Sequence, residues 1–456
     1  MSSPASTHTA LRCMLLQVVI TDSLERCSGN SRLVHLWHSS DSLLRVLTRD
    51  GWLLFLTRCT RLFAYGALSV VLVFYLTSLG LSASQTGMLL TFTLVGDTVV
   101  SLYLTTRADR IGRRRMLIIG AILMAAAGLT FAYTRSLVFL VVAGTIGVIS
   151  PSGNEVGPFL PIEQAALAHV VPNQTRTMVF AWYTLAGSFA TAAGSLGGGA
   201  LSHLLQKTAM APVESYRIVV LLYAALGVVL AFLFTRLSPA AEVSVPGAAS
   251  FGIGRSRDVV LRLSGLFALD AFAGGFVVQS FAAYWFYLRF GVSPGMLGAI
   301  FFWANVLAGV SALLASRLAA RFGLVRTMVF THLPSNILLI LVPLMPNLPL
   351  AILVLLARFS ISQMDVPTRQ SYIMAVVGPE ERSAAGGITG VARTLGAAVA
   401  PVFAGFLYGR PSLMSVPFFI AGTLKVFYDL LLYTGFAAVQ PPGEGARGAG
   451  RGSGRV

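Results

Sequence analysis

Seven polar or charged residues of this sequence stand inside long apolar runs, where a charged side chain is costly. A charge at the centre of a bilayer-spanning helix costs about 2.5–3.5 kcal/mol on insertion scales, so each is a candidate for function. Groups at this depth can bind a substrate or exchange a proton that drives its movement. The candidates are Arg61, Asp97, Asn154, Glu155, Asp270, Arg358 and Asp365.

Two of these candidates lie where glycine and proline interrupt an apolar run, over residues 149–158. Glycine and proline within a span free backbone groups, which are tolerated only where protein or a water-filled cavity satisfies them. We therefore interpret this segment as a broken helix that turns Asn154 and Glu155 toward a pathway. The alternative is a helix that ends early and leaves Glu155 in a solvated loop.

Other ionisable residues at similar depth have candidate partners close by in the sequence. Lys425 and Asp429 stand four residues apart, the spacing of a local pair on one helix. His332 is interpreted as a packed helix residue. Pairs are also expected within one further apolar run, among Arg358, Gln363, Asp365 and Arg369.

The elements that carry these residues are transmembrane helices. Of 456 residues, 55% are apolar and 11% charged, against about 25% charged in a soluble domain. The net charge of +16 comes from basic residues in short loops between apolar runs, which indicates membrane topology and argues against nucleic acid as a partner. Cysteines and histidines show no metal-ligand spacing, and no nucleotide-binding loop occurs, so we expect no metal and no cofactor.

A bilayer-spanning helix needs about 20 mostly apolar residues, and twelve runs satisfy this. An all-α membrane protein of twelve helices is therefore predicted, with an extension at 1–52, a linker at 237–257 and a Gly/Arg-rich tail at 438–456. The spans are 53–78, 84–104, 116–134, 137–157, 176–204, 216–236, 258–288, 294–315, 327–345, 348–370, 384–408 and 413–437.

Basic residues are distributed unequally between the two sets of loops. Seventeen arginines and lysines fall on one side and five on the other. The positive-inside rule places the first set in the cytoplasm, together with both termini and the linker. An even number of spans also requires both termini on one side, so the number of spans and the distribution of basic residues lead to the same topology.

The sequence also repeats itself at nearly equal offsets. A basic turn at 105–115 recurs 211 positions later, residues 161–176 match 367–382 at an offset of 206, and 61–66 align with 270–275 at 209. Near-equal offsets indicate duplication of a six-helix unit, here 53–236 and 258–437. Two parallel repeats place a substrate site between the halves, near the bilayer midplane.

At the basic turn the chain resembles the major facilitator superfamily, whose signature between spans two and three is roughly G-x-L-A-D-R-x-G-R-R/K. The run Ala108–Arg114 keeps A-D-R-x-G-R-R, while Thr105 and Arg107 replace the signature Gly and Leu. The second copy has Ala320 where the acid stands. The resemblance implies two pseudo-symmetric six-helix bundles that rock about a central cavity. It also implies that four residues form a cytoplasmic gate, namely Asp109, Arg110, Gly112 and Arg113.

In this family helices one, four, seven and ten line the cavity. The resemblance therefore implies that Arg61 and Asp270, at matching places in helices one and seven, could face each other as a pair that substrate or a proton breaks. A static buried pair is the alternative. Glycine-rich span five lacks the proline of the family's proton antiporters, and close helix packing is the simpler explanation for its glycines.

These observations predict a secondary active transporter of a small solute that works by alternating access in the plasma membrane. We expect proton coupling through Asp97 or Asp270, a monomer in the lipid bilayer, and no enzymatic activity. Efflux is favoured over uptake because few sugar-type polar side chains are present. An uptake permease or facilitator, or a non-transporting membrane sensor on the same scaffold, remain the alternatives.

Overall fold

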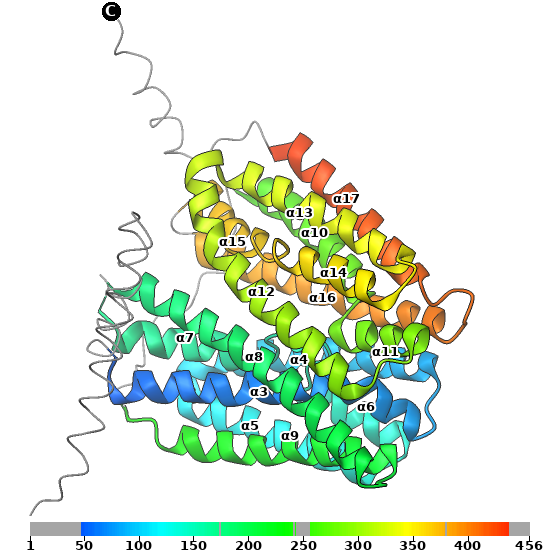
Figure 1. Ribbon diagram of the computed structural model, residues 1–456. Helices are drawn as coiled ribbons and strands as arrows, with labels where there is room; N and C mark the ends of the chain where they lie inside the picture. Colours follow the sequence, from blue (N-terminus) through cyan, green and yellow to red (C-terminus); the bar gives the residue numbers. More distant parts are fainter. Residues whose placement is uncertain (1–46, 173–174, 240–241, 243–255, 379–380, 437–456) are drawn as a thin grey trace, which may run out of the picture. The chain divides into compact units, whose positions relative to one another are not determined.

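The computed structural model describes residues 47–172, 175–239, 242, 256–378 and 381–436, and the side chains of Asp109 and Arg110 also lie outside the described part. Most of the predicted extension at 1–52, most of the linker at 237–257 and the tail at 438–456 fall outside these ranges and stay predictions, although the first described helix already begins at Arg49. Every regular element in the described ranges is helical (Figure 1). The all-α prediction is confirmed.

The helices of the described residues fall into two halves, and some of the predicted spans are made of two helices. The first half contains α3 (Arg49–Ser78), α4 (Ala83–Ile111), α5 (Arg113–Tyr133), α6 (Leu137–Ile146), α7 (Phe159–Val170), α8 (Arg176–Lys207) and α9 (Pro212–Thr235). The second contains α10 (Arg257–Gly275), α11 (Gln279–Phe290), α12 (Pro294–Phe322), α13 (Leu324–Leu341), η2 (Val342–Leu344), α14 (Leu348–Phe359), α15 (Asp365–Val376), α16 (Arg382–Tyr408) and α17 (Val416–Phe436).

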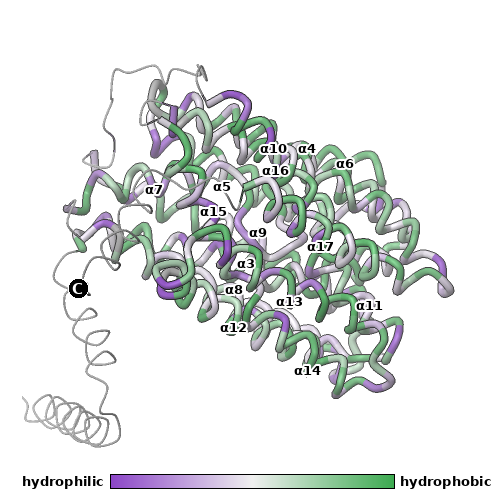
Figure 2. Tube along the Cα trace, turned by 90° about the horizontal axis from the view of Figure 1, so that it is seen from above, coloured by the Kyte–Doolittle hydropathy of each residue, from purple (hydrophilic) through white to green (hydrophobic). Residues whose placement is uncertain are grey.

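Nine helical segments in the described ranges are long and apolar enough to cross a membrane, and α6 and α14 are shorter apolar helices. Long stretches of these helices are hydrophobic, as Figure 2 shows. Large apolar side chains such as Ile122, Val138 and Phe403 are more than half exposed. An apolar surface of this kind is stable only against lipid. The chain is therefore a helical membrane protein.

The two halves use the same helix pairs. In the first half α3 packs on α8 and α5 on α9, and in the second half α10 packs on α16 and α13 on α17. The halves meet through α8 with α12 and α16 with α4, which are equivalent contacts in the repeat. The predicted duplication is thus confirmed in three dimensions as two pseudo-symmetric bundles.

The duplication extends to how the helices begin and turn. Ser82 and Ser293, 211 positions apart, each cap a helix by accepting a backbone N–H bond on Oγ. Gly112 and Gly323 join successive helices with φ of 116° and 86°, a region that side chains with a Cβ disfavour. The tight turn that the sequence predicted at Gly112 is confirmed.

Three of the predicted spans are broken. The predicted break in the fourth is confirmed, because residues 147–158 separate α6 from α7. The seventh and tenth spans were predicted as continuous, which is wrong: residues 276–278 separate α10 from α11, and 360–364 separate α14 from α15. An apolar run indicates burial in the bilayer, but it does not reveal where tertiary contacts replace helical hydrogen bonds.

Two close glycine contacts join the halves. A Cβ at Gly199 would lie 2.8 Å from the Cα of Gly298, and a Cβ at Gly405 would lie 2.8 Å from the Cα of Gly87. The two contacts are equivalent in the repeat. Gly199 of α8 aligns with Gly405 of α16 at an offset of 206, and Gly87 of α4 aligns with Gly298 of α12 at an offset of 211. Only glycine lets the helix backbones approach this closely.

Candidate functional site

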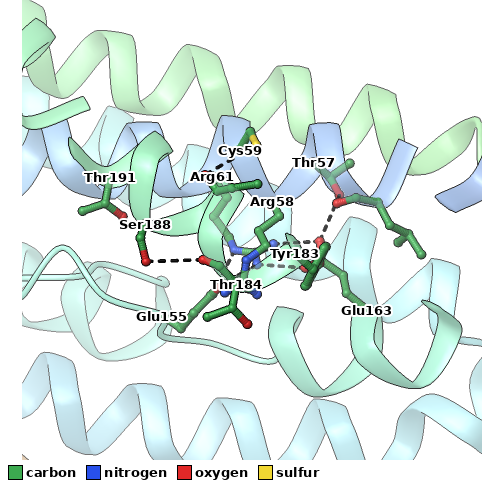
Figure 3. A network of polar contacts seen from close by, with 12 residues as sticks. Thr57, Arg58, Cys59, Arg61, Glu155, Glu163, Tyr183, Thr184, Ser188 and Thr191 are labelled. Atoms are coloured by element: carbon green, nitrogen blue, oxygen red, sulfur yellow. Dashed lines mark hydrogen bonds and ion pairs between the residues drawn. The ribbon is translucent and has the colours of Figure 1, made fainter. Parts of the chain in front are cut away.

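A buried ion pair holds α3 to α7 in the first half. The Arg61 guanidinium donates from Nη1 and Nη2 to the two carboxylate oxygens of Glu163, both at 2.8 Å (Figure 3). Both side chains are completely buried. A two-point arginine–carboxylate pair has a fixed geometry, and burial requires that the remaining polar atoms of both groups be satisfied.

Two further donors complete the shell of Glu163. The hydroxyl of Thr57 donates to Oε1 at 3.0 Å, and that of Tyr183 donates to Oε2 at 2.6 Å. Four hydrogen bonds from α3 and α8 therefore converge on this one carboxylate of α7. Such saturation fixes the relative positions of three helices.

Glu155 is the second carboxylate of this first-half network, and it lies in the break between α6 and α7. It accepts hydrogen bonds from Arg61 Nε at 3.3 Å and Nη2 at 3.1 Å. Arg58 Nη1 lies 2.9 Å from Glu155 Oε1 as an ion pair, although this N–H is not directed into a hydrogen bond. The Glu155 side chain is 18% exposed, unlike Glu163. The network thus reaches accessible space through Glu155, and a solvated-loop position for this residue is wrong.

The broken segment around Glu155 is fastened on several sides. Tyr65 donates its hydroxyl to the Val156 carbonyl, and Tyr223 donates to the Val148 carbonyl. Ser280 of the second half donates to the Pro151 carbonyl through its N–H and its hydroxyl. Backbone groups freed by the break are therefore paired with protein donors, as the bilayer requires. Asn154 is exposed beside Glu155.

A second polar network surrounds Asp270 of α10. Lys425 of α17 donates to Asp270 Oδ1, and Arg369 of α15 donates to Oδ2 at 3.3 Å. His332 Nε2 lies 3.8 Å from Oδ1. Arg369 also pairs with Asp365 at 3.0 Å, which confirms one pair predicted within the tenth apolar run. Asp270 is thus held by cationic groups from two helices.

This second-half network continues through His332. The His332 ring nitrogen Nδ1 and Asp429 Oδ1 are 2.8 Å apart, and Asn336 donates to Asp429 Oδ2 at 2.8 Å. All three side chains are buried. His332 is therefore buried, as expected of a packed helix residue, and it is also a hydrogen-bonded member of the network.

Two of the predicted ion pairs do not form. Arg61 and Asp270 bind partners within their own halves, so a pair between them is wrong. Lys425 and Asp429 share α17 at the spacing of a local pair, but each is engaged from another helix. In the interior, these residues bind partners on other helices, and the spacing of residues along one helix does not reveal such partners.

The two networks are related by the repeat with their charges exchanged. Arg61 aligns with Asp270 at an offset of 209, and Glu163 aligns with Arg369 at 206. In both halves the first helix of the repeat is therefore joined to the second part of its broken helix by an ion pair. The acid and the base have changed places between the halves, so an equivalent contact survives with opposite polarity.

Asp97 of α4 belongs to neither network. Its side chain is 6% exposed, and one carboxylate oxygen is buried without a hydrogen-bond partner. The backbone N–H of Gly157, at the end of the broken segment, interacts with the Asp97 carboxylate. Among the residues described, no arginine, lysine or histidine forms an ion pair with Asp97. Its position differs in this respect from those of Glu163 and Asp270.

Sequence reasoning missed Glu163, Arg58 and Tyr183. Glu163 fell between the predicted spans 137–157 and 176–204 and was assigned to a loop, although α7 carries it into the interior. The internal repeat contained the signal, because Glu163 aligns with Arg369, a residue that the apolar run had already marked.

The predicted cytoplasmic gate is described only in part, since the side chains of Asp109 and Arg110 lie outside the described residues. Arg113 is buried at the start of α5. The carboxylate found at that helix N-terminus is Glu242, which accepts the backbone N–H of Arg114 at 3.1 Å. An acid at this place gains from the helix dipole.

Fold, duplication and buried charge networks together define a helical membrane protein of two related bundles. The model of the Major Facilitator Superfamily matches residues 54–288 and again 263–454. The chain belongs to this family of membrane transporters.

A curated relative and several solved structures resemble the chain. The "Uncharacterized membrane protein YJR124C" of Saccharomyces cerevisiae is 30% identical over 426 residues, covering 86% of this chain and 95% of that protein. The nucleoside transporter NupG has a TM-score of 0.67 at 12% identity, covering 85% of this chain and 99% of that one. A D-xylose-proton symporter has a TM-score of 0.63 at 16% identity, covering 84% and 97%. These structural likenesses show the fold.

Proposed function

We propose that this protein is a proton-coupled secondary transporter of a small solute that works by alternating access. Membership in a transporter family supports transport, and the fold likeness to a D-xylose-proton symporter is compatible with proton coupling. The main observation in support of proton coupling is that Asp97 is a buried carboxylate with no cationic partner among the described residues. A carboxylate at this depth that is not held by a cation can take up and release a proton at low cost.

Asp97 is a better candidate for the proton site than Asp270. Asp270 is already engaged by Lys425 and Arg369, and His332 lies 3.8 Å from it. Asp97 interacts electrostatically with Tyr65 and Tyr223, neither of which is a cation. Its contact with Gly157 also ties it to the broken helix, so a change in its charge can reach the segment that carries Glu155.

Alternating access is supported by where the halves touch. The glycine contacts and the bond from Val402 N–H to Thr91 Oγ1 all lie toward the starts of α4 and α12 and the ends of α8 and α16. We propose that this end faces the extracellular side of the plasma membrane and that both termini are cytoplasmic, because basic loop residues are concentrated at the opposite end. The contacts would then form a closed outer gate.

Asp97→Asn is expected to abolish proton-coupled transport, because the neutral amide cannot carry a proton. A thermal-shift screen of a solute library first selects a solute, since a ligand of the folded state raises stability by mass action. In proteoliposomes with an imposed pH gradient, the variant is expected to lose at least about tenfold of the gradient-driven uptake of this solute, while Asp97→Glu keeps most of it. Exchange of labelled for unlabelled solute at equal pH should survive in both.

Gradient-driven uptake that is unchanged in Asp97→Asn would show that this carboxylate is not the proton site. We favour efflux over uptake, and vesicles of defined orientation distinguish the two by the sign of the gradient that drives accumulation. The absence of flux for every solute that binds would instead favour a non-transporting sensor on this scaffold.

A further inference from the structure

The polar network of the first half has equal numbers of arginines and carboxylates, whereas that of the second half does not. Arg58 and Arg61 face two carboxylates, Glu155 and Glu163. The second-half network contains the carboxylates Asp270, Asp365 and Asp429. These three carboxylates face four permanent cations, namely Arg358, Arg369, Arg393 and Lys425. His332 adds a further group that already binds Asp429. Among the described residues of this network, the cations therefore exceed the carboxylates.

Arg358 is one of the two cations without a carboxylate of its own. It lies in the last turn of α14, immediately before the break at 360–364. Its Nε is buried without a hydrogen-bond partner, and no ion pair or hydrogen bond from its terminal nitrogens occurs in the described part of the chain. The terminal nitrogens of Arg358, unlike its Nε, are not buried, and they reach accessible space.

Arg393 of α16 is in the same condition. The side chain is partly exposed, its Nε is buried without a partner, and the described residues offer it no ion pair. Asp270 and Asp365 act electrostatically on both Arg393 and Arg358. Both carboxylates are already engaged, Asp270 by Lys425 and Arg369, and Asp365 by Arg369.

The repeat shows how the imbalance arises. Arg393 aligns with Gly187, where the lack of a side chain leaves room for Arg58: a Cβ there would lie 2.6 Å from Arg58 Nε. Arg58 in turn aligns with Phe267. The second half therefore carries its arginine on α16 instead of on the first helix of the repeat.

The acid that neutralises this arginine in the first half has no counterpart in the second. Glu155 stands in the break of the first half, whereas the break at 360–364 reads Ser-Ile-Ser-Gln-Met. The second break is flanked by Arg358 instead, at the end of α14. In the first half Glu155 supplies a carboxylate from the break itself, whereas the residues of the second break supply none.

We propose that Arg358 and Arg393 bind the oxyanion group, carboxylate or phosphate, of a small organic anion that is the transported solute. This inference rests on the proposed transport function and names its substrate class. An uncompensated guanidinium at membrane depth is costly, and an anionic ligand removes that cost. The planar guanidinium groups of Arg358 and Arg393 belong to different helices, and each can donate several hydrogen bonds to the oxygen atoms of such a group.

The first arm of the test measures equilibrium binding to the purified full-length protein, which needs no transport. The probes are matched pairs: benzoate and benzamide, succinate and succinamide, adenosine monophosphate and adenosine, with inorganic phosphate alone as a further anion. At least one anion is expected to raise the Tm while its neutral partner does not, because a ligand of the folded state stabilises by mass action. In Arg358→Gln and in Arg393→Gln the apparent Kd of that anion should weaken by about tenfold or more.

The second arm measures the ligand-free protein. Removing an uncompensated cation should leave the Tm unchanged or raise it, so Arg358→Gln and Arg393→Gln are expected to be at least as stable as the parent. Arg369→Gln is the matched control, because it strips partners from Asp270 and Asp365 and should lower the Tm.

Three results would overturn the proposal: equal stabilisation by the neutral partners, no stabilisation by any anion of the set, or a clear loss of ligand-free stability in Arg358→Gln and Arg393→Gln. Failure of proton coupling would appear only in the vesicle assay with Asp97→Asn. The two proposals can therefore fail separately.

Discussion

Glu163→Gln is expected to lower the free energy of unfolding by about 3 kcal/mol, the lower end of the range for removing one partner of a buried ion pair. The substitution leaves Arg61 completely buried with only the partly exposed Glu155 to compensate it. It also replaces one of two acceptor oxygens by an amide donor opposite Tyr183 or Thr57. The measurement is thermal unfolding of the purified protein in detergent micelles.

The matched control is Glu214→Gln, the same chemical change in an ion pair on the surface. Glu214 pairs with Arg217 at 2.7 Å, but the glutamate side chain is 44% exposed. Exposed pairs contribute about 0–1 kcal/mol, so the Tm of this variant should stay close to that of the parent. Equal Tm values for Glu163→Gln and Glu214→Gln would contradict the central role assigned to Glu163.

The second large effect is expected from filling the glycine contacts between the halves. In Gly87→Ala the new Cβ would lie 2.3 Å from the Pro401 carbonyl oxygen, and in Gly199→Ala it would lie 2.4 Å from that of Pro294. Backbone atoms cannot move aside as a flexible side chain does. The double variant should therefore favour the state in which this end is open, by about 1–3 kcal/mol, the usual cost of overpacking. Such an energy shifts the ratio of the two states by about 5-fold to 150-fold.

Spin labels report this shift directly. Ser84 and Arg410 are exposed near the contact of α4 with α16, and cysteines can be placed there after the native cysteines are replaced by serine. The distance distribution of the double variant should gain a longer component. Gly265→Ala is the control, since nothing lies within 4 Å of its added Cβ. Unchanged distances in the double variant would mean that these contacts do not form a gate.

Much of the architecture could be predicted from neighbouring residues alone. Apolar runs identified the spans, and the fourth was correctly predicted to break because glycine and proline stand within it. The break at 360–364 contains neither residue, so the tenth span was predicted as continuous. Local composition therefore identified a break only where glycine and proline themselves interrupt the hydrogen bonds of the helix.

The candidate site was predictable as a set of residues but not as a set of contacts. Arg61 and Asp270 were correctly placed at buried depth, yet each binds a partner within its own half. Asp97 and Asp270 could not be distinguished in the sequence, because each is a single aspartate in an apolar run. The structure separates them, since cations surround Asp270 and none pairs with Asp97 among the residues described.

By itself the sequence determined the membrane class, the six-plus-six duplication, the family resemblance and the depth of the ionisable residues. These properties depend on composition and on spacing along one helix or between two repeats. Only the tertiary structure decided that Arg61 pairs with Glu163, 102 positions away, and that no carboxylate in the described part of the chain forms an ion pair with Arg358 or Arg393. The physical reason is that an ion pair depends on separations of about 3 Å, which are set by how distant helices cross and where they break.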